Sequence, residues 1–459
     1  MIELEKHAEA ILAAALQNGG QLAEIFMEET VRTVISFENN KVEKVITGTD
    51  AGAGIRHLSG DRTLYGHTNE LSEESLVALA GEIAGGADDE RASHNFEFAP
   101  ERFCVAPKLP PAEVATPRKL ELVRAANAVA RAYDPRVVQV AVSYADSLRY
   151  VAIANSEGRL VEESRPQLIF NVRVVAREGD LLQSAYEVAG GTLGFEMFDE
   201  IDPETIALRA AKRACLMLEA DPAPTGRMPV VLSSEAGGTM VHEAVGHGLE
   251  ADHIDKGVSK YCGRLNEQIA VPEVTIVDDG SLPGKRGSAS VDDEGVPTRR
   301  TVLVDKGILV GYLNDRRTAA KLEMEPTGNG RRQSYRCKPI PRMTNTMVVS
   351  GEADPAAILA ETDKGLFVKK MGGGQVNPLN GDYVFEVSEG YLIQNGKAET
   401  PVRGATLIGN GPDTLMQIEA VGNDLGFAIG TCGKDGQGVP VSDAQPTLRI
   451  RELTIGGTG

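Results

Sequence analysis

The stretch PVVLSSEAGGTMVHEAVGHGLE, residues 229–250, joins a short apolar run to a segment that carries two histidines. Its pattern predicts a strand over 228–232 and a helix over about 234–249. Three of the seven histidines, His242, His247 and His253, fall in or directly after this stretch. A helix that follows a buried strand can present polar side chains inside a protein, so we expect a functional site here.

The two histidines of this stretch have an unusual spacing. His242 and His247 are five residues apart, whereas the His-Glu-x-x-His motif of zinc peptidases separates its histidines by four. Residues in an α-helix turn by roughly 100° each, so positions i and i+5 diverge by about 140°. A π-bulge would restore a common face, and Gly246 would lower the cost of a non-ideal backbone there. The spacing therefore predicts a helix with a bulge between His242 and His247.

Glu243 stands next to the first histidine, where zinc peptidases carry their general base. From that position a carboxylate can take the proton of a metal-bound water and later pass it to the leaving amine. A catalytic zinc also needs a third protein ligand. The spacing leaves Glu250, Asp252, His253 or a distant residue as candidates.

Cys432 is one such distant residue, because it lies among glycines in GTCGKDGQ, residues 430–437, on a predicted turn. The five cysteines are odd in number and scattered, which argues against a disulfide framework. Most of them should be reduced thiols, which leaves room for one with a special role.

Outside this stretch, turn and strand signals divide the chain. The sequence DPAPTG at 221–226 predicts a linker, because proline and glycine interrupt regular structure. We expect an α+β protein with a mixed N-terminal domain of antiparallel strands over 1–220. A mostly β C-terminal domain over 227–459 would carry the metal-binding helix. In the first domain we predict helices over 4–18, 72–84, 117–132 and 203–219, with short strands between them.

The composition excludes some functions. The net charge of −19 disfavours nucleic-acid binding, which depends on Lys and Arg. The chain has no apolar run of 18 or more residues, and its start lacks the layout of a signal peptide. We therefore expect a cytoplasmic protein that contacts neither nucleic acid nor a membrane.

Several separate motifs resemble those of the TldD/PmbA family, once called modulators of DNA gyrase, and of its TldD branch in particular. They are HEAVGHGLEAD (242–252), VDDG (277–280), DDEG (292–295), PTGNGRR (326–332), PRMTNT (341–346), GGGQ (372–375) and CGKDGQ (432–437). Their order along the chain makes the resemblance more specific than any single motif. The similarity is looser in the first domain, where GIRHLSG at 54–60 is the clearest match.

The resemblance implies a zinc peptidase whose metal ligands are His242, His247 and Cys432 and whose base is Glu243. It also implies an unfolded or extended peptide as substrate, held through main-chain hydrogen bonds. The protein would be a homodimer, or a heterodimer with a PmbA/TldE-type paralogue. Two alternatives stay open: a non-catalytic peptide-binding or regulatory subunit, and a zinc hydrolase of a non-peptide amide.

Three further motifs have both a structural and a functional interpretation. Gly372–Gly374 lacks the Lys and Ser/Thr of a phosphate-binding loop, which leaves a plain turn or a strand edge for a peptide backbone. The acidic residues at 278–279 and 292–294 fit turn or loop carboxylates better than a cation site. A basic cluster favours an ion-paired surface, with contact to a substrate carboxylate or an acidic partner as the alternative. Its members are Arg331, Arg332, Arg336 and Arg342.

Overall fold

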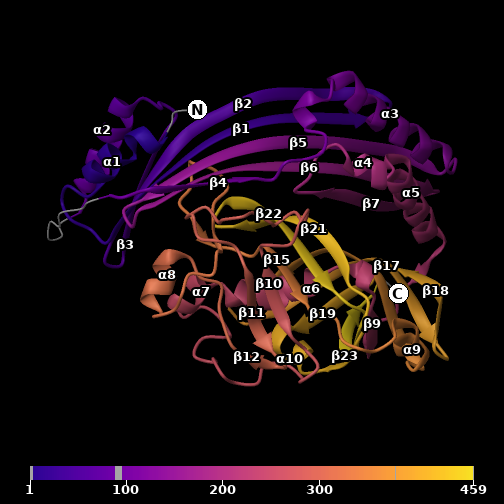
Figure 1. Cartoon of the computed structure of the whole chain (residues 1–459). Helices are drawn as coiled ribbons and strands as arrows, with labels where there is room; N and C mark the ends of the chain where they lie inside the picture. Colours follow the sequence, from indigo (N-terminus) through magenta and orange to yellow (C-terminus); the bar gives the residue numbers. More distant parts are fainter. Residues whose placement is uncertain (1–3, 88–95, 378, 458–459) are drawn as a thin grey trace.

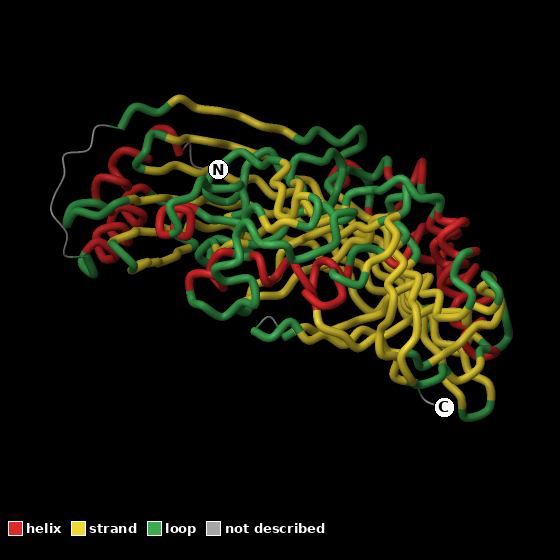
Figure 2. The backbone as a smooth tube through the Cα atoms, turned by 90° about the horizontal axis from the view of Figure 1, so that it is seen from below, coloured by secondary structure: helices red, strands yellow, loops and turns green. Residues whose placement is uncertain are grey.

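The structure, a computed structural model, describes residues 4–87, 96–377 and 379–457. A long sheet built from the first part of the chain arches over the sheets of the second part (Figure 1). Most strand pairs are antiparallel, and helices lie at the ends of the long sheet (Figure 2). The predicted α+β class is therefore confirmed, with antiparallel strands in the first part and mostly strands in the second.

The first sheet has seven strands in the order β3-β2-β1-β5-β6-β4, and β7 also pairs with β6. Its strands are β1 (Leu22–Glu38), β2 (Lys41–Ser59), β3 (Arg62–Thr68), β4 (Ala99–Cys104), β5 (Val137–Asn155), β6 (Arg159–Glu178) and β7 (Leu181–Gly191).

Helices cover the two ends of this sheet (Figure 1). α1 (Leu4–Ala15) and α2 (Glu73–Ala84) share one apolar core with β1 and β2, while α3 (Thr116–Ala132) and α5 (Pro203–Glu219) share another with β5 and β6. The short elements are η1 (Pro111–Glu113) and α4 (Met197–Glu200). All four long helices predicted from the sequence are present.

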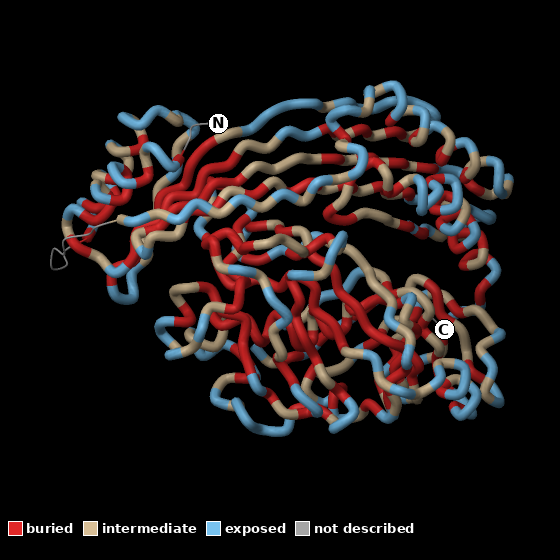
Figure 3. Tube along the Cα trace, in the orientation of Figure 1, coloured by how far each residue is buried: buried red, intermediate tan, exposed pale blue. Residues whose placement is uncertain are grey.

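The strands are longer than the sequence pattern predicts. β1 and β2 are each one continuous strand where the sequence predicts short strands, and a tight turn at Asn39 and Asn40, both at positive φ, joins them. Residues 41–50 of β2 are largely exposed (Figure 3). Their sequence therefore lacks the alternation of buried apolar and exposed polar residues by which a strand is recognised. The strand continues because its backbone stays paired with β1 along its whole length.

The second part contains a six-stranded and an eight-stranded sheet, besides a two-stranded one. The first consists of β10 (Ile276–Asp279), β11 (Arg300–Asp305), β12 (Ile308–Leu309), β15 (Asn345–Val348), β21 (Gly426–Lys434) and β22 (Gln437–Gln445). The second consists of β8 (Asp221–Pro222), β9 (Gly226–Leu232), β16 (Lys364–Val376), β17 (Asp382–Gln394), β18 (Lys397–Arg403), β19 (Thr406–Asn410), β20 (Ile418–Val421) and β23 (Leu448–Gly456). The pair is β13 (Gly330–Arg331) and β14 (Ile340–Pro341).

Short helices complete the second part. They are η2 (Ser234–Ala236), α6 (Thr239–Val241), η3 (His242–Gly246), η4 (His247–Leu249), α7 (Ala251–Asp255), α8 (Arg316–Lys321), α9 (Pro355–Ala360) and α10 (Gly411–Leu415). The predicted linker contains β8 and the first residue of β9, and the division into domains at 221–226 stays a prediction.

β9 brings the histidine-bearing segment into the largest apolar core. Val230 and Leu232 of β9 are fully buried in it together with Val241 and Val245. All five cysteines are free, as the sequence predicts. Within the described residues, no helix is both long enough and apolar enough to cross a lipid bilayer.

Candidate metal centre

The segment that carries the two histidines forms one π-helical turn. η3 spans His242–Gly246 as a π-helix between the α-helical α6 and the 3₁₀ turn η4. The extra residue of a π turn rotates His247 back toward the face of His242. The bulge predicted from the i,i+5 spacing is therefore confirmed, while the single helix expected over 234–249 is divided into short pieces.

Gly246 has a different role from the one expected. Its φ of −53° and ψ of −54° are ordinary helical values, so the expectation that glycine eases an irregular backbone there is wrong. A Cβ at this position would lie 2.0 Å from Sδ of Met343. Glycine is therefore required because the π turn packs directly against Met343.

Three potential metal ligands meet at this turn. Nε2 of His242 and Nε2 of His247 each lie 3.3 Å from Sγ of Cys432, which β21 brings from a distant part of the chain. The two imidazole rings are 5.1 Å apart and nearly perpendicular. All three side chains are buried, and their donor atoms lie within 4.8 Å of one another.

This donor set suits zinc. Ligand atoms about 2.1 and 2.3 Å from a tetrahedral zinc ion lie roughly 3.6 Å from each other, close to the separations found here. Two imidazoles and a thiolate are also preferred zinc donors, and three protein ligands leave a fourth position for a reactant. The assignment of His242, His247 and Cys432 as ligands stays a prediction, and these distances support it.

A carboxylate orients the second histidine from behind. Nδ1 of His247 lies 2.9 Å from Oε2 of Glu250, which is fully buried. Metal-binding histidines commonly donate their other ring N–H to a carboxylate, which fixes the tautomer and the orientation of the ring. Lys434 neutralises this group, since its Nζ lies 3.0 Å from Glu250 and 2.6 Å from Asp252.

The other third-ligand candidates are engaged elsewhere. Glu250, Asp252 and His253 also lie close to one another. However, Glu250 and Asp252 bind Lys434, and Nδ1 of His253 lies 2.8 Å from the carbonyl oxygen of His247. Each of these side chains supports the histidine turn or the strand of Cys432.

Ionisation of the three donors is coupled. Burial disfavours the Cys432 thiolate, but the hydrogen bonds and charges of His242 and His247 outweigh it and lower the pKa of Cys432 to about 5. Burial also disfavours the His247 imidazolium, yet Glu250 and Cys432 raise the pKa of His247 well above its usual value. In the metal-free protein the group is therefore a thiolate beside protonated imidazole.

The basic cluster is mostly not a surface feature. Arg332 and Arg342 are fully buried, so the expectation of an ion-paired surface is wrong for them, while the exposed Arg336 pairs with Asp50 as expected. Arg342 donates to the carbonyl oxygens of Cys432 and Gln437 and so holds the strand of the third donor in place. Sequence reasoning missed Arg342 and Lys434 at this site, although Lys434 lies two residues from Cys432 on a strand and therefore on the same face.

The acidic residues agree with expectation in part, since Asp293 and Glu294 lie in a turn as predicted. Asp278 lies in β10 and is buried, where it accepts hydrogen bonds from Thr344 and Thr346, so a loop position is wrong for it. Glu294 pairs with Arg56, and Asp293 pairs with Arg165. These carboxylates join parts of the fold, and guanidinium groups rather than a metal ion balance the last two.

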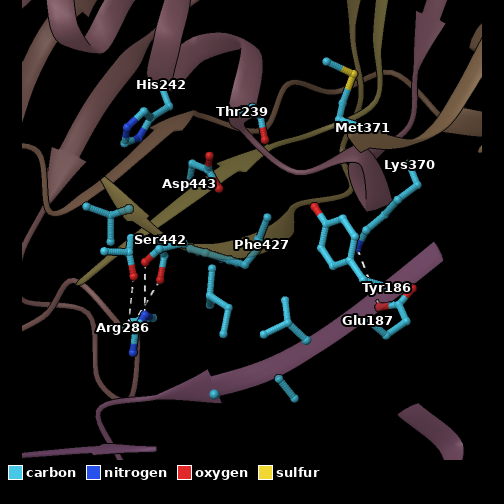
Figure 4. Close-up of a pocket in the computed structure, with 18 of the residues that line it drawn as sticks. Tyr186, Glu187, Thr239, His242, Arg286, Lys370, Met371, Phe427, Ser442 and Asp443 are labelled. Carbon is cyan, nitrogen blue, oxygen red and sulfur yellow. Dashed lines mark hydrogen bonds and ion pairs between the residues drawn. The ribbon is translucent and has the colours of Figure 1, made fainter. Parts of the chain in front are cut away.

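The three donors face a large cleft. It has a volume of about 910 Å³, and its walls include β7, α5, the glycines of β16 and strand β21. Figure 4 shows His242 and Asp443 in this cleft together with Tyr186 and Glu187 of β7. Glu243 also lines the cleft, and its Oε2 lies 3.9 Å from Nε2 of His247. A carboxylate thus borders the donor cluster on its open side.

The glycine motif belongs to this wall. Gly372–Gly374 lies within β16, so the plain turn is wrong and the predicted strand is confirmed, while docking of a peptide backbone there stays a prediction. The pairing of β16 with β17 is irregular at Met371 and Gly374, and a Cβ on Gly373 would meet nothing within 4 Å.

Comparison with known proteins identifies the family. Residues 23–85, 109–218 and 225–457 match domain 1, the central domain and the C-terminal domain of PmbA/TldA metallopeptidases. The chain belongs to the PmbA/TldD metallopeptidase family. The resemblance noted from the sequence motifs is therefore confirmed.

Individual relatives cover nearly the whole PmbA/TldD chain. A metalloprotease TldD homologue of Haemophilus influenzae is 38% identical over 89% of this chain and 87% of its own length. A zinc metalloprotease TldD homologue of Saccharolobus solfataricus is 28% identical over 96% and 97%. Among solved structures, a Thermotoga maritima protein named as a modulator of DNA gyrase has a TM-score of 0.80 at 24% identity, covering 99% and 100% of the two chains. TldE of Thermococcus kodakarensis has a TM-score of 0.76 at 20% identity, covering 98% and 100%.

Proposed function

We propose that this metallopeptidase-family chain is a zinc-dependent peptidase that hydrolyses unfolded or extended peptides. One observation carries the proposal: His242, His247 and Cys432 converge within 4.8 Å, and Glu243 borders the same cleft. A non-catalytic peptide-binding subunit would not need this donor set. A zinc hydrolase of a non-peptide amide would share it and differs only in substrate.

The protein residues have distinct roles in the proposed reaction. A zinc ion bound by the three donors would supply a Lewis acid that acidifies water and polarises a carbonyl group. Glu243 accepts the proton of the attacking water and delivers it to the leaving amine nitrogen. Glu250 holds the His247 ring, and Lys434 keeps the negative charge of Glu250 balanced.

The walls of the cleft favour an extended main chain as the ligand. β7 pairs only with β6, and β21 pairs only with β22, among the described residues, so each presents an unpaired strand edge. Both strands line the cleft, together with the glycines of β16. An extended peptide can hydrogen-bond to such an edge through its backbone, largely independently of its sequence. The homodimer, or heterodimer with a PmbA/TldE-type paralogue, that the resemblance implies stays a prediction.

The test combines metal content with peptide cleavage. We expect about one zinc per chain by metal analysis, and cleavage of an unstructured peptide detected by mass spectrometry. Glu243→Ala should keep its zinc and lose at least about 100-fold in turnover, the usual contribution of a general base. His247→Ala should lose the zinc itself. Peptide cleavage by Glu243→Ala at the wild-type rate would remove Glu243 as the base, and a metal-free wild type after zinc addition would refute the proposal.

A further inference from the structure

A second cavity adjoins the cleft of the metal centre. Its volume is about 420 Å³, and it lies between the long sheet of the first part and the loops of the second. Arg286 and Thr431 line both this cavity and the cleft. Arg286 and Thr431, the residue that directly precedes Cys432, therefore belong to a wall that both spaces share.

This cavity is positively charged in an acidic protein. Six arginine and four carboxylate side chains line it, an excess of two positive charges in a chain whose net charge is −19. The carboxylates Glu28, Asp146 and Asp293 are already paired with Arg149, Lys119 and Arg165. The fourth, Asp292, accepts hydrogen bonds from the backbone N–H groups of Glu294, Val296 and Gly330, so none of the four forms an ion pair with Arg286 or Arg331.

Arg286 is the buried arginine that lacks a counter-ion. It is 8% exposed, and it donates to the carbonyl oxygen of Gly430 and to side-chain oxygens of Gln167 and Thr431. Among the residues that the structure describes, no carboxylate lies within ion-pair distance of it. Burial lowers the pKa of Arg286 to about 10, which still leaves it charged at neutral pH.

The half-buried Arg331 lines the same cavity and also lacks an ion-pair partner among the described residues. Its guanidinium donates to the carbonyl oxygens of Met343 and Pro440. Buried charges are normally paired, because an isolated one loses its hydration without compensation. Two guanidinium groups without a direct ion-pair partner on one cavity, the buried Arg286 and the half-buried Arg331, indicate that a ligand supplies a negative charge there.

We infer that this cavity is a subsite for a carboxylate group of the peptide substrate, anchored by Arg286, with Arg331 also on its wall. A guanidinium binds a carboxylate through two parallel hydrogen bonds, so the chemical match is direct. The inference rests on the proposed peptidase function. The bound carboxylate can be either the C-terminal carboxylate of the peptide or an Asp or Glu side chain.

The position of Arg286 relates the carboxylate to the cleavage point. Gly430, which accepts from Arg286, precedes Cys432 by two residues in the extended strand β21. Two residues of a strand span roughly 7 Å. A carboxylate bound at Arg286 therefore lies within about two peptide residues of the metal centre, and Figure 4 shows Arg286 beside Ser442 among the residues that line the cleft.

Binding to the zinc-loaded Glu243→Gln protein separates this inference from catalysis. The probes are one unstructured peptide as free acid, the same peptide as C-terminal amide, and the amide with a single Glu near its end. The peptide contains no other acidic residues. Calorimetry should show that the free acid or the Glu-containing amide binds about 10- to 100-fold more tightly than the plain amide. Tighter binding of the free acid identifies the C-terminus, and tighter binding of the Glu peptide identifies a side chain.

Variants assign the preference to Arg286. When Arg286→Gln is added, the carboxylate-containing peptide should bind about as tightly as the plain amide. Arg286→Lys keeps the charge but not the paired donors, so part of the difference in affinity should remain. Arg451→Gln is the matched control, since this arginine is exposed on β23 and outside both cavities. Thermal unfolding of each variant checks that it is folded.

Two results would overturn the inference. One is equal binding of all three peptides, and the other is a preference that survives Arg286→Gln in a folded protein. Wild-type cleavage of the plain amide would in either case leave the proposed peptidase function intact. Failure of the wild type to bind or cleave any peptide would instead refute that function, and the subsite with it.

Discussion

At the scale of single residues, the donor cluster depends on one side chain that is remote in sequence. Cys432 lies 3.3 Å from both histidine nitrogens, although 185 residues separate it from His247. A thiolate binds zinc strongly and reduces the net charge of the site. Serine at this position would keep the volume but lose the soft, anionic donor.

We therefore expect Cys432→Ser to weaken zinc binding by at least about 100-fold, as loss of an inner ligand exceeds the 10- to 100-fold cost of losing an outer one. Competition with a chromophoric chelator measures the affinity. Cys104→Ser is the matched control, because Cys104 is an exposed free cysteine on β4, in the first sheet. Unchanged zinc affinity in Cys432→Ser would return the third-ligand question to Glu250 or His253.

Proton release on metal binding provides a second test at this scale. The pKa of Cys432 is about 5 and that of His247 is raised well above 6.5, so near pH 7 the thiol has already ionised and the imidazole is protonated. Zinc must displace the imidazole proton, and its affinity should therefore rise with pH until His247 loses its proton unaided.

Calorimetry in buffers of different ionisation enthalpy should show that protons are released near pH 7. In Glu250→Gln the pKa of His247 should fall, because the charge that favours the imidazolium is gone. Fewer protons should then be released at the same pH. Equal proton release by the two proteins would contradict the assigned role of Glu250.

At this scale the sequence predicts residue types better than their surroundings. The histidine spacing and Glu243 can be recognised because they are local in the chain. The burial of Arg332 and Arg342 cannot be recognised from the sequence, because their partners Glu24 and Cys432 lie in distant strands of the chain. Likewise, Met343 requires a glycine at 246 through a contact that no local pattern contains.

At the scale of secondary-structure elements, the π turn of η3 is the feature that brings the histidines together. It was predictable because i,i+5 histidines cannot share a face of a regular α-helix. The lengths of β1 and β2 were not predictable, because backbone pairing with neighbours continues where the apolar alternation stops. Local patterns therefore describe an irregular element better than long, partly exposed strands.

The packing of this turn can be tested with Gly246→Ala. The added Cβ would lie 2.0 Å from Sδ of Met343, so the turn or the methionine must move. Overpacking of this kind costs about 1–3 kcal/mol in the free energy of unfolding, measured by urea denaturation. Zinc affinity should fall as well, because the turn carries both histidines.

A second change distinguishes packing from backbone effects. Met343→Ala in the Gly246→Ala background should restore part of the zinc affinity, since it removes the colliding side chain. Gly48→Ala is the control, as a Cβ there meets nothing within 4 Å and its φ is not positive. If the double variant binds zinc no better than Gly246→Ala alone, Met343 is not the reason for glycine at this position.

At the scale of the whole molecule, buried ion pairs join the long sheet to the second part of the chain. Glu24 of β1 accepts hydrogen bonds from Arg56 of β2 and from Arg332, and Arg56 also binds Glu294. All four side chains are at most 2% exposed. The residues that carry this contact are spread over 308 positions, so no local sequence pattern could have revealed it.

Glu24→Gln should therefore destabilise the entire protein. It leaves Arg56 and Arg332 buried with one carboxylate fewer, and breaking a buried pair from one side costs about 3–5 kcal/mol. Urea denaturation followed by fluorescence of a label on each part measures the free energy of unfolding. We expect the loss in both signals, because the contact belongs to both parts.

An exposed pair provides the comparison. Arg118 and Glu121 are also ion-paired, but both side chains are more than 60% exposed, so Glu121→Gln should cost about 0–1 kcal/mol. If Glu24→Gln costs no more than Glu121→Gln, the buried network contributes little to holding the two parts together. The cleft between them, whose walls are β7 on one side and β16 and β21 on the other, would then depend on apolar packing and on other pairs between the parts, such as Arg165 with Asp293.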